Sequence, residues 1–539
     1  MGASSSKEQT ISSEQREVET LAASTGALPM LQKSFSKLAD PQSNTIPLQS
    51  LKQCFSLNYK DPIFEVPAIH DNFMGVLDHL GSSLVDLFFV PEKGGVSWVE
   101  FVKAYVKCCG RISASTSLNT LLRLFHMTMD KAGFSSKLEF ESDDADCKIS
   151  GSLLPIDVLM LLCMCWTMQW NFRSLKFFKR QEKLCLPDFS HLVLSSVISC
   201  DEVGSGFNVW KCDISSLDFN LPVGKFLTWT MKTVPSIVDC FTEFFHAKLQ
   251  ISGTLEDKLV PSSSSSCYTS ETKACDTVLL TLGRAWAISL TLKGVVSEEI
   301  LKTCFPCEDD GTDENLLYRS SLQGRGLNRF WSNVEGYHGP LLFLISAISQ
   351  DHHEESTNAR KWIIGALMQQ GFENKDLFYG NSGNLYTLNP VFNVFSPSGK
   401  EKNFVYSHSH PTGRVYEPHP KPVGIAFGGT IGNERIFIDD DFATVTVRHH
   451  AIDKTYQPGS LIPYQGYLPV EAMISEVEVW GLGGRTANKV QASYKKREEL
   501  FTEQRRKVDL KTFASWEDSP EKMMMDMVSN PDRVQREDR

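Results

Sequence analysis

Residues 423–448 read VGIAFGGTIGNERIFIDDDFATVTVR, and the last fifteen alternate apolar and polar side chains across an acidic turn. Ile436 and Ile438 fall on one face of an extended chain, and Arg435 falls on the other. After the turn, valine and threonine alternate in the same way over residues 444–447. A period of two is typical of a strand with one buried face, so two antiparallel strands are predicted here.

The same rhythm extends over residues 315–484, where short apolar runs alternate with Gly, Pro, Asn and Ser. The final run, residues 474–484, reads ISEVEVWGLGG and again places valines on one face. Several antiparallel strands joined by tight turns are therefore expected. The predicted fold class is α+β, with a β-sandwich and a few flanking helices in this part of the chain.

These residues resemble a TLDc domain, the module of the oxidation-resistance and nuclear-receptor-coactivator type proteins. Four pieces occur in the family's order: LLY with Ser320, FYG before LYTL, a Gly-Gly turn before IFID, and the closing EVWG. Phe427 departs from the pattern, because many members carry another glycine there. The resemblance implies structural roles for Tyr318, Gly380, Gly428, Gly429, Asp439, Glu478 and Trp480.

Length and composition describe a globular protein of two to four domains. The chain has 539 residues, of which 41% are hydrophobic and 22% charged. Its net charge of -11 argues against a nucleic-acid partner. No apolar run reaches the roughly 18 residues that a spanning helix needs, and residues 158–166 are expected to form a buried helix instead.

The cysteines favour a cytoplasmic protein with reduced thiols. All 14 precede Gly311, and no apolar leader with a cleavage site opens the chain. The segment that resembles a TLDc domain, 315–484, therefore contains no thiol and cannot act through thiol redox chemistry.

The chain begins MGASSSK, which fits the N-myristoylation pattern with Gly2 as acceptor and Ser6 at the required position. The alternative is an ordinary polar tail. One myristoyl chain gives only marginal, reversible membrane binding, so a second contact, with a membrane-bound protein, is expected.

Residues 28–250 are expected to be helical and to resemble paired EF-hands that have lost calcium. Leu31, Phe35 and Leu38 share one helix face. One candidate loop offers Asp40 and Asn44, and another offers Gly94 at its turn and Glu100 at the bidentate position. Each lacks the other ligands that Ca²⁺ requires, so no metal is predicted, and a working calcium sensor is kept as an alternative function.

The runner-up function, ahead of the calcium sensor, is an antioxidant or hydrolytic enzyme that uses His410 and Asp439 of the sandwich, because carboxylates and imidazoles supply acid–base chemistry. No nucleophile with a recognisable base partner is evident, and the glycine-rich turns lack the residues of a phosphate loop. No cofactor is predicted.

The stretch from 492 to 511, ASYKKREELFTEQRRKVDLK, is expected to be an exposed charged helix. Its candidate partner-binding residues are Leu500, Phe501, Val508 and Leu510, which could enter a groove on another protein. The alternative is a solvated helix that packs only on its own domain.

The expected organisation is a flexible tail with the lipidation signal (1–27), a helical region (28–250), a Ser-rich linker (251–275), a TLDc domain (276–485) and a charged helix with its tail (486–539). This order resembles the myristoylated, mTOR-associated TLDc proteins of lysosomal membranes. The resemblance implies a non-enzymatic regulator that binds the vacuolar proton-pumping ATPase. It further implies a cytoplasmic protein, peripheral on the lysosomal or vacuolar membrane, in TOR-type or oxidative-stress signalling.

Overall fold

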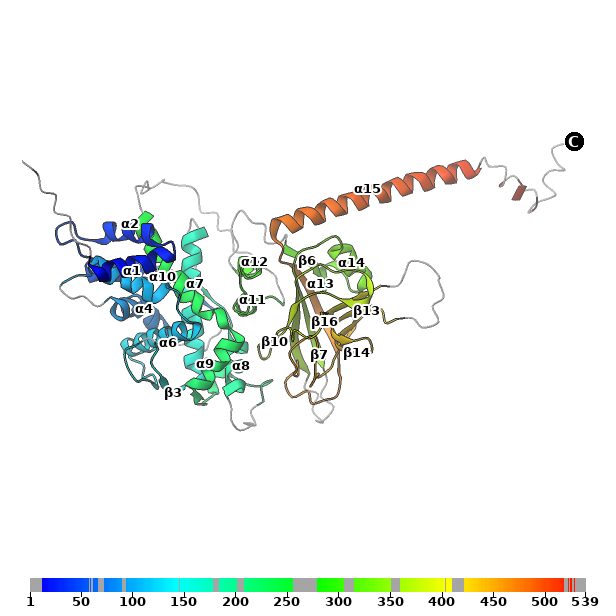
Figure 1. Ribbon diagram of the computed structural model, residues 1–539. Helices are drawn as coiled ribbons and strands as arrows, with labels where there is room; N and C mark the ends of the chain where they lie inside the picture. Colours follow the sequence, from blue (N-terminus) through cyan, green and yellow to red (C-terminus); the bar gives the residue numbers. More distant parts are fainter. Residues whose placement is uncertain are drawn as a thin grey trace, which may run out of the picture.

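The computed structural model describes residues 12–57, 59, 62–65, 72–89, 94–144, 146–177, 184–200, 208–254, 279–304, 315–349, 359–402, 404–409, 421–517, 522, 524–525 and 528. A helical half is followed by a curled antiparallel sheet and then by one long helix (Figure 1). The predicted α+β class is confirmed.

The helical half contains ten α-helices within the described residues. They are α1 (Ser13–Ser24), α2 (Leu28–Leu38), α3 (Leu48–Phe55), α4 (Asn72–Phe88), α5 (Trp98–Cys109), α6 (Ala114–Lys131), α7 (Pro155–Phe177), α8 (Ser190–Cys200), α9 (Val223–Thr233) and α10 (Asp239–Thr254). Short strands and 3-10 turns join them: β1 (Ile63–Phe64), β2 (Leu138–Phe140), β3 (Ile149–Leu153), β4 (Cys185–Leu186), β5 (Leu221–Pro222), η1 (Ile214–Ser216) and η2 (Pro235–Val238).

Helices α2–α3 and α4–α5 form two helix–loop–helix units that are joined as paired EF-hands are. Ile46 in the first loop and Val96 in the second exchange two backbone hydrogen bonds, of 2.9 and 2.8 Å. Leu31 and Phe35 are buried on α2, as the periodicity predicts. The second loop ends in a capping box, in which Ser97 and Glu100 satisfy each other's backbone N–H groups at the start of α5.

Helix α10 occupies the centre of this pair of units. Phe245 of α10 packs against Phe55 of α3 and Phe89 after α4, with ring centroids 4.9 and 6.1 Å apart. Lys248 donates to the carbonyl of Ser56 at 2.6 Å, and burial lowers its pKa to about 8. The helical region is therefore held around one internal helix.

The expected flexible tail through residue 27 is wrong for α1. Ser12 caps this helix, and Val18 and Ala22 are buried on one of its faces. The indole N–H of Trp98 also donates to Glu19 at 2.7 Å. The sequence of α1 is mostly polar, and tertiary contact with α5 compensates for its weak apolar stripe.

The last third contains an 11-stranded antiparallel sheet in the described residues, in the order β11-β10-β8-β7-β16-β15-β14-β13-β12-β9, with β6 paired to β16. The strands are β6 (Leu316–Arg319), β7 (Leu341–Ser349), β8 (Arg360–Met368), β9 (Lys375–Tyr379), β10 (Gly383–Asn389), β11 (Asn393–Phe395), β12 (Val405–His408), β13 (Gly424–Thr430), β14 (Asn433–Asp439), β15 (Thr444–Val447) and β16 (Val470–Gly481). The two walls of the expected sandwich thus belong to one continuous, curled sheet.

The sheet buries both of its faces along β7, β8, β10 and β16. On β7, Phe343 and Ile345 point into the core enclosed by the sheet, whereas Leu342 and Leu344 belong to the core shared with the helical half. Successive side chains of a strand point to opposite faces. These strands therefore read as nearly continuous apolar runs, as strands covered on both sides do.

Two short helices, α11 (Leu282–Ser289) and α12 (Val295–Cys304), lie between the helical half and the sheet (Figure 1). Trp286 of α11 donates to Gln169 of α7 at 2.5 Å. Glu298 of α12 binds Arg173 of α7 through two hydrogen bonds, of 2.8 and 2.9 Å. A bidentate arginine–carboxylate pair adds geometric specificity to this contact.

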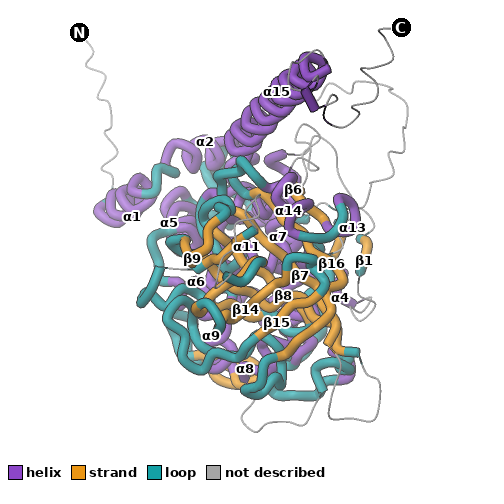
Figure 2. The backbone as a smooth tube through the Cα atoms, turned by 90° about the vertical axis from the view of Figure 1, so that its right-hand side faces the viewer, coloured by secondary structure: helices purple, strands orange, loops and turns teal. Residues whose placement is uncertain are grey.

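The long helix α15 (Gly484–Glu517) follows β16 and leaves the body beside α13 (Ser320–Gln323) and α14 (Leu327–Val334). Figures 1 and 2 both show α15 projecting beyond the sheet domain. Residues 158–166 lie inside α7, as predicted. None of the helices in the described part of the chain is both long and apolar enough to span a bilayer.

We expect Phe245→Ala to lower the free energy of unfolding by about 3–5 kcal/mol, because it opens a cavity at the centre of the helical half. Chemical denaturation followed by circular dichroism measures the change. Leu322→Ala is the control: this side chain is 67% exposed, and its loss should change stability by no more than about 0.5 kcal/mol. Equal effects of the two changes would contradict a central role for α10.

Candidate functional site

Glycines that carry the family resemblance sit where the backbone needs them. Gly428 and Gly429 in β13 have φ of +69° and +84°, and Gly380 after β9 has φ of +99°. A Cβ at Gly428 would lie 2.9 Å from the ring of Tyr456, and one at Gly429 would lie 2.2 Å from the carbonyl of Asn433. Only glycine adopts these positive φ angles without strain and also leaves empty the space that a Cβ would occupy.

Asp439 closes the turn between β14 and β15. Its carboxylate accepts from the backbone N–H groups of Ala443 and Thr444, at 2.8 and 3.0 Å, and from the Thr444 hydroxyl at 3.0 Å. Both carboxylate oxygens of Asp439 are therefore used in hydrogen bonds that hold the turn. His410, the other residue of the enzymatic alternative, lies outside the described residues, and its neighbour His408 ends β12.

Glu478 is a fully buried carboxylate on β16, where the sheet meets the segment that leads into α11. It accepts from the backbone N–H groups of Leu279 and Leu280, both at 3.3 Å, and from the indole of Trp480 at 3.2 Å. The guanidinium of Arg319 lies 3.7 Å away. A buried charge requires such partners, so Glu478 fixes the entry of the chain into the sheet domain.

A second carboxylate, Glu476, lies on the other side of Arg319 at 3.9 Å. It accepts from the hydroxyl of Ser320 and from the backbone N–H of Ser321. Burial alone would raise the pKa of Glu476, but these hydrogen bonds outweigh burial and hold its pKa below the usual value. Neighbouring Tyr318 is also buried, and its hydroxyl donates to the carbonyl of Gly324 at 2.7 Å.

Sequence reasoning missed a buried ionic cluster behind β14. The alternation places Arg435 on the polar face of its strand, yet it is fully buried and binds Asp453 at 2.8 Å. His450 lies 3.6 Å from the same carboxylate. Burial opposes ionisation of Asp453, but hydrogen bonds from His450 and Thr455 and the charge of Arg435 hold its pKa far below the usual value. The sequence spacing does not predict this pairing, because His450 and Asp453 lie in the loop that follows β15.

The degenerate EF-hand positions are used for loop geometry and helix capping. Asn44 and Gly94 adopt φ of +52° and +71°. The carboxylate of Glu100, which sits at the bidentate position, accepts from the backbone N–H of Ser97 at 2.6 Å. Asp40 accepts hydrogen bonds from its own loop. Within the described residues, no group of three or more His, Cys, Asp and Glu side chains is placed to hold a metal ion.

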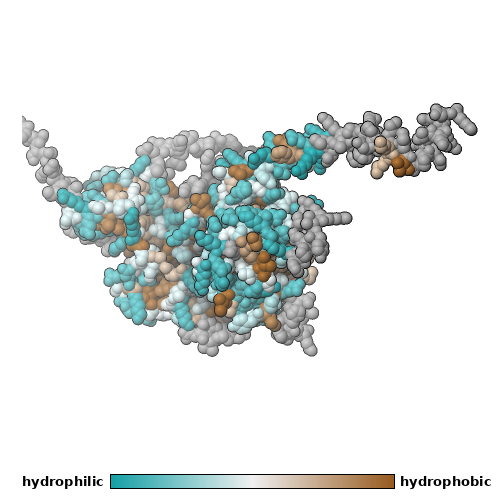
Figure 3. Space-filling view, turned by 45° about the vertical axis from the view of Figure 1, so that its right-hand side comes forward, coloured by the Kyte–Doolittle hydropathy of each residue, from teal (hydrophilic) through white to brown (hydrophobic). Residues whose placement is uncertain are grey.

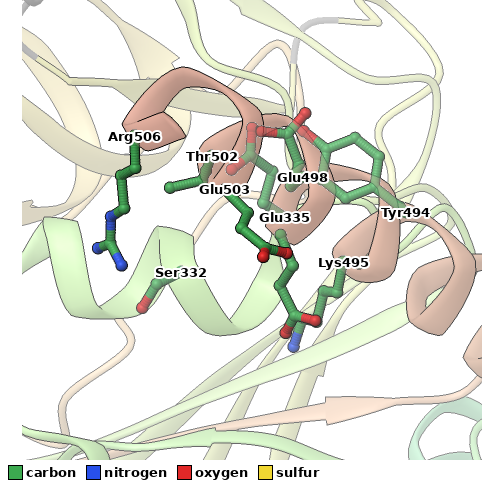
Figure 4. A pocket seen from close by; sticks show the side chains of 9 residues that line it. Ser332, Glu335, Tyr494, Lys495, Glu498, Thr502, Glu503 and Arg506 are labelled. Atoms are coloured by element: carbon green, nitrogen blue, oxygen red, sulfur yellow. Dashed lines mark hydrogen bonds between the residues drawn. The ribbon is translucent and has the colours of Figure 1, made fainter. Parts of the chain in front are cut away.

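A cleft of about 530 Å³ opens between α14 and α15. Figure 4 shows Ser332 and Glu335 on one wall and side chains of α15, from Tyr494 to Arg506, on the other. At the base of the cleft, Lys495 donates to the carbonyl of Asn333 at 3.0 Å, and Tyr494 donates to Glu335 at 3.0 Å. These contacts anchor the start of α15, and the helix diverges from the body beyond them.

Of the four predicted partner-binding residues, Leu500 and Phe501 are 51% and 59% exposed on α15. Val508 and Leu510 lie in the same helix, but their side chains fall outside the described ones. Gly2, the predicted lipid acceptor, also lies outside the described residues.

We expect Glu478→Ala to lower the free energy of unfolding by about 3–5 kcal/mol, because it leaves two backbone N–H groups buried without their acceptor and removes one of the two carboxylates beside Arg319. Chemical denaturation measures the total loss, and hydrogen exchange at Leu279 and Leu280 locates it. Glu471→Ala, at an exposed position of the same strand, is the matched control. Unchanged exchange at the two leucines would refute the anchoring role.

Comparison with known proteins places this geometry in a family. Residues 297–483 match the model of the TLDc domain. The chain is also similar to a protein named Restriction of telomere capping protein 5 of Kluyveromyces lactis, with 26% identity over 174 residues. That match covers 30% of this chain and 30% of the relative's own length. The curled sheet that begins near α12 and ends at β16 is therefore a TLDc domain.

Proposed function

We propose that this protein is a non-enzymatic, membrane-associated adaptor that binds the vacuolar proton-pumping ATPase through its TLDc domain and α15. It acts in lysosomal or vacuolar, TOR-type or oxidative-stress signalling. The observation that carries the proposal is the combination of a TLDc domain with a long helix whose apolar side chains Leu500 and Phe501 are exposed beyond the body.

The chemistry of the family-motif residues supports an adaptor over an enzyme. Asp439 and Glu478 bind backbone N–H groups of their own chain, and Gly428 and Gly429 have positive φ within β13. A catalytic carboxylate must reach a substrate, whereas these carboxylates are engaged with their own chain. We expect the TLDc domain to bind another macromolecule through a preformed, rigid surface.

The exposed part of α15 supports a helix-mediated contact. Its residues 496–507 are exposed on every side, and Figure 3 shows the described stretch as mainly hydrophilic with scattered apolar residues. A projecting helix that presents a few large apolar side chains suits a groove on a partner. Aromatic side chains contribute disproportionately to such contacts, which makes Phe501 the expected anchor.

Membrane association in this proposal needs two contacts. A single myristoyl chain on Gly2 gives reversible binding, and the ATPase supplies the second attachment. The protein would then be cytoplasmic when detached and peripheral on the lysosomal or vacuolar membrane when both contacts form.

Affinity purification of the full chain from cell extract should recover subunits of the ATPase. The double change Leu500→Asp/Phe501→Asp should reduce their recovery by roughly tenfold or more, since losing a central apolar anchor costs at least one such step in affinity. Leu322→Asp, at an exposed site on α13, is the control. A folded bait that recovers no subunit would count against the proposal.

Gly2→Ala removes the acceptor for myristate and should move the protein from the membrane fraction to the soluble fraction. Cell fractionation with immunoblotting measures the ratio. Ala3→Ser keeps the acceptor pattern and should leave the ratio unchanged. If Gly2→Ala fractionates like the natural sequence, the lipid anchor is refuted while the ATPase contact stays open to the purification experiment.

A further inference from the structure

Three connections of the TLDc sheet lie at one end of it. Strands β13, β14, β15 and β16 are antiparallel neighbours, so the turn at residues 431–432 and the long connection at 448–469 fall at the same end. Residues 396–402, which lead toward β12, also fall there because β12 is antiparallel to β13. Strand β16 starts at this end, and α15 leaves the domain from the other (Figure 1).

This end of the sheet exposes large apolar side chains, which together are called the apolar tip. They are between 41% and 86% exposed: Ile431, Ile452, Tyr464, Tyr467 and Leu468. The last three stand in residues 455–470, a stretch that contains no Asp, Glu, Lys, Arg or His. Single exposed apolar residues are ordinary, but a group of them at one place marks an interaction site.

The long connection that carries most of the apolar tip is fixed to the domain. Leu461 and Ile462 are buried, and the side-chain amide of Gln465 donates to a backbone carbonyl of β15 at 2.7 Å. The imidazole of His449 stacks on the ring of Tyr467, with centroids 4.8 Å apart and planes 5° apart. The tip is therefore presented in one arrangement, so binding loses little conformational entropy.

Lysines stand beside the apolar tip. The backbone N–H of Glu401 donates to the carbonyl of Lys454 at 3.1 Å, and the two side chains form an ion pair at 3.2 Å. Lys400 and Lys402 flank Glu401, and both are exposed. Lys454 is two residues from Ile452 of the tip. This group therefore has three positive charges against one negative, in a chain whose net charge is -11.

We propose that this end of the TLDc domain binds the surface of a bilayer that contains anionic lipids. The apolar tip enters the membrane–water interface, and the three lysines lie at the level of the lipid phosphates. Tyrosine suits this position, because its ring is apolar while its hydroxyl stays in contact with water. Each lysine near an anionic leaflet adds a favourable electrostatic contribution.

The exposure and the charge of this surface favour a bilayer over a protein. Ile452, Tyr467 and Leu468 are 76–86% exposed, so they project with few neighbours and do not form the packed centre of a protein interface. A fluid interface accepts projecting apolar groups without a matching pocket. A second copy that paired through the same surface about a twofold axis would bring like charges together.

The bilayer contact goes beyond the proposed function and does not rest on it. The apolar tip and α15 lie at opposite ends of the sheet, so the two surfaces do not overlap. The contact also needs no myristoyl chain, because the attachment belongs to the TLDc domain itself.

The test is co-sedimentation of the purified full chain with vesicles, in a Gly2→Ala background so that no lipid chain contributes. The protein should bind vesicles of mixed phosphatidylserine and phosphatidylcholine more tightly than vesicles of phosphatidylcholine alone. High salt should weaken binding to the mixed vesicles, because it screens the lysines from the lipid phosphates.

Leu468→Asp in this background should weaken binding to the mixed vesicles by roughly tenfold or more, because it removes an apolar group from the interface and adds a charge there. Val295→Asp is the matched control. Val295 is 73% exposed on α12, and its replacement adds the same charge away from the tip. It should bind like the background chain.

The double change Lys400→Glu/Lys402→Glu should also weaken binding by roughly tenfold or more, since each lysine near the surface contributes about fivefold. Lys33→Glu/Lys37→Glu, at exposed positions of α2, makes the same change in net charge and should have little effect. Circular dichroism checks that every variant keeps the fold of the background chain.

Three results would overturn the proposal. The background chain could fail to bind the mixed vesicles, or it could bind them equally well after both the tip and the lysine substitutions. Soluble glycerophosphoserine could also abolish vesicle binding, which would assign the lysines to a free phosphate instead of a bilayer. None of these results bears on recovery of the ATPase by the full chain, so the two proposals fail separately.

Discussion

The sheet domain depends on strands that are apolar on both faces. Leu342 and Leu344 of β7 cannot face water together with Trp480 of β16, so helices must cover this outer face. The helical half and α11 supply that cover. The contacts between Arg173 and Glu298, and between Trp286 and Gln169, then orient it. One apolar face thus unites two parts of the chain that differ in secondary structure.

Buried charges determine how the chain enters and closes the sheet. Glu478 and Glu476 flank Arg319 and bind backbone N–H groups from two segments distant in sequence. Arg435 and Asp453 do the same for the loop behind β14. Removing one partner of such a pair is costly, because the other charge stays buried. These residues therefore specify one arrangement of loops, which a purely apolar core would leave less defined.

We propose that this protein acts by binding other macromolecules. Asp439, the carboxylate of the enzymatic alternative, holds a turn, while Leu500 and Phe501 of α15 are more than half exposed. In the proposed function, a groove on the vacuolar ATPase covers these side chains.

The sequence by itself determined the α+β class, the strands around Ile436 and the charged helix that follows the sheet. Those features follow from local periodicity and backbone preference. Gly428 and Gly429, which were expected at a turn, lie within β13, and the turn follows at residues 431–432. Only the tertiary structure decided that α1 is ordered, that Arg435 is buried, and that the two sandwich walls are one sheet. Each of these depends on contacts between residues far apart in the chain. A local sequence pattern does not predict which distant residue will pair with a buried charge, or which element will cover an apolar face.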